Sequence, residues 1–273
     1  MAKVRGNLRN LLIALDKEKE EEKQDMGVRF ISDLYNSIKI DAQKEIKVPS
    51  AKFKPSSMKC CRNMQYQIMQ VEPEKEDISA EMVGILESGT DRHLRIQTAI
   101  THMKENGFDC EYLKVGDYVR NRQQNGQLLD LEIVNEEGIE TKLYNKKWNI
   151  SFMCDGLILF HNKYYILEIK TETTIKNQKR TNMDENHIPQ ICAYYLSFGI
   201  PDVMMLYENR DILQKKAYCV TVTDQMVFEN VISKIETVNT AISLGELAPT
   251  HKSTNCNYCS YRNRCKRDGE LSA

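Results

Sequence analysis

The sequence has no long apolar run. The stretch Leu11–Leu15 is far shorter than the roughly 20 apolar residues of a membrane span, and it is also too short for the core of a signal peptide. Internal repeats and linkers rich in Gly, Ser or Pro are absent from the sequence as well. These absences argue against a membrane-spanning chain, and we expect a soluble, intracellular (cytoplasmic) protein.

An excess of charge of one sign is also missing. The chain has 38 Lys and Arg against 39 Asp and Glu, so its formal net charge is −1. No overall field therefore attracts nucleic acid, and contact with a polyanion must come from local basic clusters. In such clusters cations can follow a phosphate backbone and tyrosines can stack on unpaired bases, although any one cluster is typical of ordinary surface. The clusters are Lys142, Lys146 and Lys147; Lys176, Lys179 and Arg180; and Arg262, Arg264, Lys266 and Arg267, interleaved with Tyr258 and Tyr261.

A length of 273 residues with 41% hydrophobic content is enough for one large domain or two small ones. Apolar spacing predicts a helix with one apolar stripe that packs into the core: Phe30, Ile31, Leu34, Tyr35 and Ile38. It also predicts a long helix from Asp77 to Glu105, capped by Asp77 or Ser79. The apolar stripe of this second helix consists of Met82, Ile85, Leu86 and Ile96. β-like segments are predicted at Tyr112–Arg120, Leu128–Val134, Ile139–Leu143, Trp148–Met153, Val203–Tyr207 and Ala217–Val222. A mobile loop is predicted over residues 171–186, and helices over Ile188–Phe198 and Asp224–Leu244.

The segment Cys154–Lys170 is predicted to be a hairpin of two apolar strands with a tight turn at His161–Lys163. If the turn is centred on Asn162 and Lys163, Asp155 lies opposite Lys170. Glu168 is then the diagonal neighbour of Asp155, at about 7–8 Å. Strand alternation places the three charged residues on one face, and apolar neighbours indicate that both faces are covered. Charges in such a strand are costly unless they are paired or bind metal, so we interpret the hairpin as a site.

Two neighbouring carboxylates suit a divalent cation. Mg²⁺ prefers one or two carboxylates together with waters and phosphate oxygens, and it can activate a water for phosphodiester hydrolysis. Lys170 can then orient the water or stabilise the developing negative charge. Taken alone, however, an Asp and a Glu-x-Lys pair on a surface hairpin explain the same pattern slightly better.

Residues outside the hairpin reverse this balance. Asp155 with Glu168-Ile169-Lys170 resembles the RecB-like branch of the PD-(D/E)XK nucleases. The segment from Gly89 to His93 is similar to the upstream G-x-x-x-H of that branch, and the segment from Gln190 to Tyr194 is similar to its downstream Q-x-x-x-Y. The order and spacing agree, and the resemblance covers roughly residues 53–267. It implies that His93, Asp155 and Glu168 hold Mg²⁺ or Mn²⁺, that Lys170 assists, and that Gln190 and Tyr194 position the site or the DNA backbone.

Nine cysteines is an odd number for a disulfide framework, and we expect reduced thiols or metal ligands. Cys256, Cys259 and Cys265 are closely spaced in the tail, and the fourth ligand of a site there would be Cys60 or Cys61. By spacing alone, a Cys₄ zinc site and a [4Fe–4S] cluster fit equally. The other four cysteines are predicted to be core thiols: Cys110, Cys154, Cys192 and Cys219.

A subset of RecB-like nucleases, including AddB-type and CRISPR-associated exonucleases, is similar in having one upstream and three downstream cysteines around an iron–sulfur cluster. This resemblance implies a [4Fe–4S] cluster rather than Zn²⁺. In the subset the upstream cysteine follows Pro-Ser-Ser and is followed by x-Arg and an aromatic residue, so Arg62 and Tyr66 favour Cys60, with Cys61 as the alternative. The implied ligands are Cys60, Cys256, Cys259 and Cys265.

These observations predict an α/β fold: a PD-(D/E)XK restriction-endonuclease-like core with a mixed central sheet flanked by helices, plus an N- and C-terminal subdomain held by the iron–sulfur cluster. The expected organisation is a helical region over 1–52, the RecB-like nuclease core over 53–248, and a cysteine-rich tail over 249–273 that packs with the Cys60 region. The expected function is a Mg/Mn-dependent deoxyribonuclease, an exonuclease acting on single-stranded DNA or DNA ends, with a homo-oligomer left open. The alternative is a non-catalytic nucleic-acid-binding or assembly subunit with a structural Cys₄ metal site.

Overall fold

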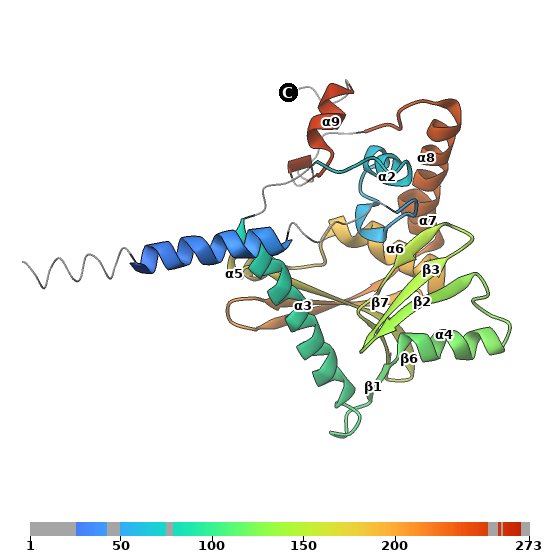
Figure 1. Cartoon of the computed structure of the whole chain (residues 1–273). Coiled ribbons are helices and arrows are strands. Elements are labelled where there is room, and N and C mark those ends of the chain that lie inside the picture. Colours follow the sequence, from blue (N-terminus) through green and yellow to red (C-terminus); the bar gives the residue numbers. More distant parts are fainter. Residues whose placement is uncertain (1–25, 43–49, 75–78, 251–255, 258, 269–273) are drawn as a thin grey trace, which may run out of the picture. The chain divides into compact units, whose positions relative to one another are not determined.

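The computed structural model describes residues 26–42, 50–74, 79–250, 256–257 and 259–268 (Figure 1). The chain divides into two compact units, Met1–Lys47 with Asp77–Ser88, and Val48–Glu76 with Gly89–Ala273. Asp77 and Tyr258 lie outside the described residues. No helix in the described part of the chain is long and apolar enough to cross a membrane.

The first unit contains a helix over residues 26–42 and the beginning of α3 (Ala80–Thr101). Ser79 caps α3, because its Oγ accepts a hydrogen bond from the Met82 backbone N–H at 3.2 Å. The prediction that the first apolar stripe packs into the core is wrong, because Phe30, Ile31, Leu34 and Tyr35 are exposed. Of the predicted stripe on α3, Ile96 is buried, whereas Met82, Ile85 and Leu86 are exposed. Helical spacing shows that a helix is amphipathic, but it does not show what covers the apolar face.

The second unit is built on a five-stranded sheet with the order β1-β5-β6-β7-β8. The parallel pair β6 and β7 is joined through a helix, as such pairs require, and the other neighbours are antiparallel. The strands are β1 (Cys110–Leu113), β5 (Gly156–Phe160), β6 (Lys163–Glu172), β7 (Asp202–Asn209) and β8 (Lys215–Thr221). A second, antiparallel sheet consists of β2 (Leu131–Glu137), β3 (Glu140–Asn145) and β4 (Ile150–Phe152). The predicted mixed central sheet with flanking helices is therefore confirmed.

Helix α6 follows the predicted boundaries, Ile188–Phe198. Pro189 lies in its first turn, and Gly199 ends it in the left-handed conformation with φ +69°. The other helices are α2 (Cys61–Ile68), α4 (Val115–Gln124), α5 (Thr174–Lys179), α7 (Asp224–Val227), a π-helical stretch (Phe228–Ile232), α8 (Ser233–Leu244) and α9 (Arg262–Arg267). Short 3₁₀ turns occur at Pro55–Ser57 and Glu185–His187.

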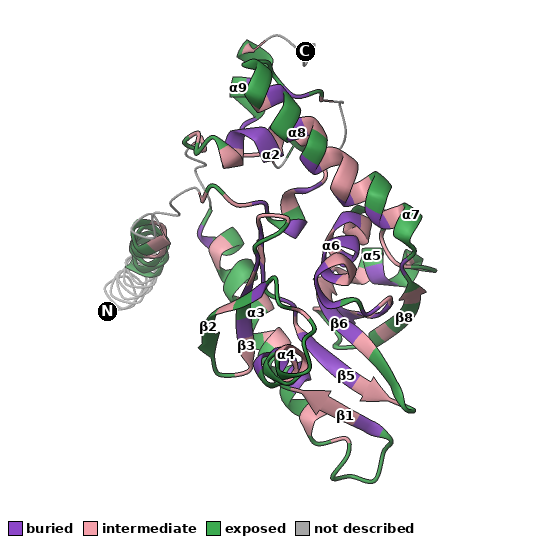
Figure 2. Ribbon diagram, turned by 90° about the vertical axis from the view of Figure 1, so that its right-hand side faces the viewer, coloured by how far each residue is buried: buried purple, intermediate pink, exposed green. Residues whose placement is uncertain are grey.

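Both faces of the central sheet are covered, as predicted. On one face Leu157 and Ile166 join the core that α4 and α6 complete. On the other, Leu167 and Ile169 pack with Ile96 of α3. Residues 166–169, in the middle of β6, are accordingly buried (Figure 2). A charged residue in this strand therefore needs a partner.

The predicted turn of the β5–β6 hairpin is wrong by one position. His161 and Asn162 form the turn, with φ +47° and +61°, and Phe160 pairs with Lys163. Positive φ at both central residues is typical of a type I′ turn, which Asn tolerates. Pairing continues to Gly156 and Leu167, so one further step places Asp155 across from Glu168 and not from Lys170. The charged residues keep their predicted face, because the register differs by two residues and alternation has a period of two.

Two segment predictions are also wrong. The predicted strand Tyr112–Arg120 is β1 followed at once by α4, because Val115 and Val119 are buried on one helical face at i and i+4. The predicted mobile loop over residues 171–186 is instead the end of β6, α5 and a 3₁₀ turn. Within this segment, Glu172 and Arg180 form a buried ion pair. Arg180 therefore does not belong to a basic surface cluster.

Candidate active site

Asp155 lies at the entry to β5 and is held by three other elements. Its Oδ1 is 3.0 Å from Nδ1 of His93 on α3, and its Oδ2 accepts a hydrogen bond from the backbone N–H of Ile169 on β6 at 2.6 Å. The Asp155 carbonyl accepts hydrogen bonds from Gln97 Nε2 at 2.6 Å and from the Tyr112 hydroxyl at 2.9 Å. Both the carboxylate and the backbone of Asp155 are therefore fixed in place.

Glu168 is the most deeply buried carboxylate of the site, with a side chain 3% exposed. Its Oε1 accepts hydrogen bonds from Lys170 Nζ and, at 2.7 Å, from Gln190 Nε2. Burial, followed by the negative charge of Asp155, raises the pKa of Glu168 to about 7, while Lys170 opposes this. Two carboxylates thus lie near each other in a buried place, which favours a cation between them.

A chain of hydrogen bonds runs from α6 to the segment before Asp155. Besides its bond to Glu168, Gln190 Nε2 donates to the Tyr194 hydroxyl at 2.7 Å. The Tyr194 hydroxyl in turn donates to the carbonyl of Met153 at 2.8 Å, and Tyr194 is buried. The two residues stand at i and i+4 and reach the site from one helical face.

The pKa values of both basic groups of the site are shifted upward. Burial lowers the pKa of His93, but the hydrogen bond and charge of Asp155 outweigh it, and the net shift is upward. Burial likewise lowers the pKa of Lys170, and the neighbouring Glu168 carboxylate reverses the sign. Asp155 and Glu168 thus each lie beside a basic side chain, His93 and Lys170 respectively.

The donor set suits a hard divalent cation in its chemistry. One imidazole and two carboxylates are ligands that Mg²⁺ and Mn²⁺ accept. Within the described residues no three His, Cys, Asp or Glu side chains stand in a metal-binding arrangement. His93 contacts Asp155, and Glu168 contacts Lys170. The buried carboxylate of Glu168 beside the half-buried carboxylate of Asp155 is the feature that fits a cation.

The structure brings the six predicted residues together: His93, Asp155, Glu168, Lys170, Gln190 and Tyr194. Sequence reasoning missed three supporting residues. Gln97 stands one turn after His93, a spacing that predicts a shared face. Tyr112 and Gly156 depend on the pairing of β1 with β5: a Cβ on Gly156 would lie 2.5 Å from the Tyr112 ring, so only glycine leaves room for that ring.

The four proposed cluster cysteines line one cavity of about 290 Å³ between α2 and the tail. Cys60 Sγ lies 3.4 Å from Thr250 Oγ1, and Asn63 Nδ2 donates to Cys259 Sγ at 3.3 Å. Thiolates are the ligands that a soft metal prefers, but in this structure no three of the described cysteines stand in a metal-binding arrangement. The lining consists of Cys60, Cys256, Cys259 and Cys265 with neighbouring polar and aromatic residues, and Cys61 packs instead against the main core.

The remaining cysteines divide between the core and the surface. Cys110, Cys154 and Cys192 are buried, as predicted for core thiols. Cys219 is exposed, so its prediction is wrong. It lies on β8, the edge strand, where alternate residues point away from the core.

No protein-family model matches this chain, and no curated protein matches it. Solved structures that it resembles include SSO0001, with a TM-score of 0.47 and 16% identity over 89% of this chain and 98% of that one. LHK-Exo in complex with dAMP has a TM-score of 0.45 and 14% identity over 71% of this chain and 89% of that one. The alkaline exonuclease LHK-Exo from Laribacter hongkongensis has a TM-score of 0.41 and 14% identity over 72% and 90%. Likeness at these levels does not assign a function, which must come from the site itself.

Proposed function

We propose that the chain is a metal-dependent deoxyribonuclease that hydrolyses phosphodiester bonds, acting as an exonuclease on single-stranded DNA or DNA ends. The observation that carries the proposal is the meeting of His93, Asp155 and Lys170, from α3, the entry to β5, and β6, around the buried Glu168 carboxylate. This donor set belongs to metal-assisted hydrolysis of a phosphate ester.

His93, Asp155 and Glu168 would hold Mg²⁺ or Mn²⁺, which when bound supplies Lewis-acid polarisation of the phosphate and a more acidic water. Lys170 brings a positive charge to the Glu168 carboxylate. There it would stabilise the negative charge that develops on the phosphate. Gln190 and Tyr194 keep Glu168 oriented from α6, and Gln97 and Tyr112 do the same for the Asp155 backbone.

The cysteine cavity would hold a [4Fe–4S] cluster, with Zn²⁺ as the alternative. Its ligands would be Cys60 beside α2 and Cys256, Cys259 and Cys265 of the tail. A metal centre that joins segments so far apart in the sequence adds its binding free energy to folding, so we assign it a structural role.

Cleavage of end-labelled single- and double-stranded DNA with Mg²⁺ or Mn²⁺ tests the activity. Glu168→Gln and Lys170→Ala should each lose at least about 100-fold in rate, as expected for groups that bind or stabilise charge in the transition state. Lys179→Ala, an exposed lysine of α5, serves as the control. Equal cleavage by all four proteins would indicate contamination and end the proposal. DNA binding without cleavage would favour a non-catalytic subunit. Circular single strands should resist cleavage if the enzyme needs an end.

Anaerobic purification followed by absorption spectroscopy and metal analysis tests the cluster. We expect a brown protein whose iron is lost in Cys60→Ala and retained in Cys61→Ala. A colourless protein that contains zinc would replace the iron–sulfur assignment with a zinc site. Loss of iron in Cys61→Ala alone would assign the ligand to Cys61.

A further inference from the structure

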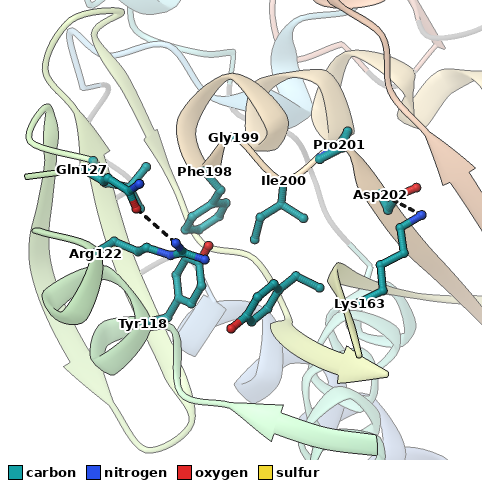
Figure 3. Close-up of a pocket in the computed structure, with 11 residues that line it drawn as sticks. Tyr118, Arg122, Gln127, Lys163, Phe198, Gly199, Ile200, Pro201 and Asp202 are labelled. Carbon is teal, nitrogen blue, oxygen red and sulfur yellow. Dashed lines mark hydrogen bonds and ion pairs between the residues drawn. The ribbon is translucent and has the colours of Figure 1, made fainter. Parts of the chain in front are cut away.

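Figure 3 shows a second cavity, formed by residues other than those of the candidate active site. Its volume is about 450 Å³, within the range of small-ligand pockets. Its lining comes from Tyr118 and Arg122 of α4, from Lys163 and Tyr164 of β6, and from the end of α6 with the following residues up to Asp202. None of the six residues of the candidate active site lines it.

Three aromatic rings form much of the wall. The ring centroids of Tyr118 and Tyr164 are 5.7 Å apart, and those of Tyr118 and Phe198 are 6.5 Å apart. Tyr164 is 38% exposed, so its ring is accessible at the mouth. The Arg122 guanidinium lies 5.0 Å from the Tyr118 ring centroid and 5.6 Å from that of Tyr164. Rings and a guanidinium plane are surfaces on which a flat, unsaturated ring can stack.

The cavity also carries a positive charge without a counter-ion. Lys163 Nζ is paired at 2.8 Å with Asp202, which is buried and also accepts a hydrogen bond from Thr221 Oγ1 at 2.7 Å, so this pair is neutral. Arg122 instead donates to the uncharged amide of Gln127 at 3.1 Å and forms no ion pair with any described residue. Figure 3 shows Arg122 and the Lys163–Asp202 pair on opposite sides of the space. The cavity therefore suits a ligand that is anionic.

We propose that this cavity binds one unpaired nucleotide of a DNA strand, with the base against the tyrosine rings and its phosphate at Arg122. A nucleotide combines a flat ring with an anion, which is the combination that the lining offers. An aromatic side chain of a partner protein would use the rings but leave Arg122 without a counter-charge. The choice of DNA rests on the proposed nuclease function, whereas the flat anionic ring follows from the cavity alone.

Binding can be measured without cleavage by fluorescence anisotropy of a labelled short oligothymidylate, with EDTA in place of divalent cations. Tyr164→Ala should weaken binding about 5- to 150-fold, the range for loss of one stacked base. Tyr164→Phe keeps the ring and should bind like the wild type. Arg122→Gln should weaken binding and reduce the dependence of log K on log salt by about one unit.

Matched controls stand beside both residues. Tyr165 follows Tyr164 on the opposite face of β6 and packs with the core cluster that contains Leu167. Arg120 also lies on α4, but it is paired with Glu136. Tyr165→Ala and Arg120→Gln should leave the affinity unchanged. Wild-type affinity in both Tyr164→Ala and Arg122→Gln would overturn the inference, as would equal weakening by the controls.

The nuclease proposal fails or stands separately from this inference. An inactive wild type that still binds oligothymidylate through Tyr164 and Arg122 would overturn only the nuclease function. If the wild type is active but Tyr164→Ala and Arg122→Gln bind DNA as tightly as the wild type, only the nucleotide pocket would be overturned.

Discussion

Substitution of Arg180 tests whether its ion pair fixes the segment between Lys170 and Gln190. The Arg180 guanidinium donates to both oxygens of Glu172 at 2.7 to 2.9 Å, and Asn177 Nδ2 donates to the same carboxylate at 3.0 Å. The two charged side chains are 6% and 3% exposed. Solvent therefore hardly screens the pair, and Arg180→Met would leave the Glu172 carboxylate buried with only an amide as partner.

The expected cost follows from that burial. Breaking a buried pair by removing one partner costs about 3–5 kcal/mol, and the remaining Asn177 bond places the expectation at the lower end. For a chain of this size 1 kcal/mol corresponds to about 2–4 °C in Tm, so Arg180→Met should lower Tm by roughly 6–12 °C. The free energy of unfolding is measured by urea denaturation followed by circular dichroism.

Two further variants separate charge from packing. The double variant Glu172→Leu with Arg180→Met removes both charges and should recover most of the loss, because apolar residues often replace a buried pair at little cost. Lys176→Met removes an exposed lysine from its pair with the half-buried Asp184 and should cost less than about 1 kcal/mol. The reasoning would be refuted if Arg180→Met were as stable as Lys176→Met. A double variant as unstable as the single one would assign the loss to the contact of Arg180 with the Tyr207 ring, 4.0 Å from its centroid.

Three other substitutions have defined outcomes. Gly156→Ala places a Cβ 2.5 Å from the Tyr112 ring and should cost about 1–3 kcal/mol in urea denaturation while reducing DNA cleavage; unchanged cleavage would contradict the role of Tyr112. Tyr194→Phe leaves the Gln190 amide with one partner fewer and should also cost about 1–3 kcal/mol, so a neutral effect would show that water replaces the hydroxyl. Burial, followed by the charge of Lys170, lowers the pKa of His187 from 6.5 to about 4, so the unfolded chain binds the proton first and stability falls as pH drops from 6.5 to 4. His187→Gln should lose less stability over this interval, and parallel curves would contradict the shift.

The parts of the fold that could be predicted are those with strong local signals. Pro189 and Gly199 mark the two ends of α6, and alternation in β6 places Glu168 and Lys170 on one face. The six residues of the candidate site could be assembled from spaced motifs, because those motifs state which residues meet without stating how. Their detailed geometry, including the Asp155–Glu168 pairing, depended on one turn position.

The parts that could not be predicted depend on contacts distant in sequence. Residues 171–186 are polar, so their sequence indicates a loop, yet the buried partner of Arg180 makes them ordered. Tyr112 reaches the Asp155 carbonyl only because β1 pairs with β5, and no local pattern announces that pairing. Likewise, the exposure of Phe30 reflects what covers a helix and not its periodicity.

Helix α6 touches two places of proposed function with its opposite ends. Gln190 near its beginning contacts Glu168, and Phe198 at its end lines the second cavity. An α-helix rises about 1.5 Å per residue, so the interval between these residues is roughly 12 Å and cannot change unless the helix unwinds. If both proposals hold, a DNA strand bound at both ends of α6 would be cut at a fixed distance from the nucleotide held in the cavity. Inserting one helical turn into α6 would lengthen that offset by about 5.4 Å.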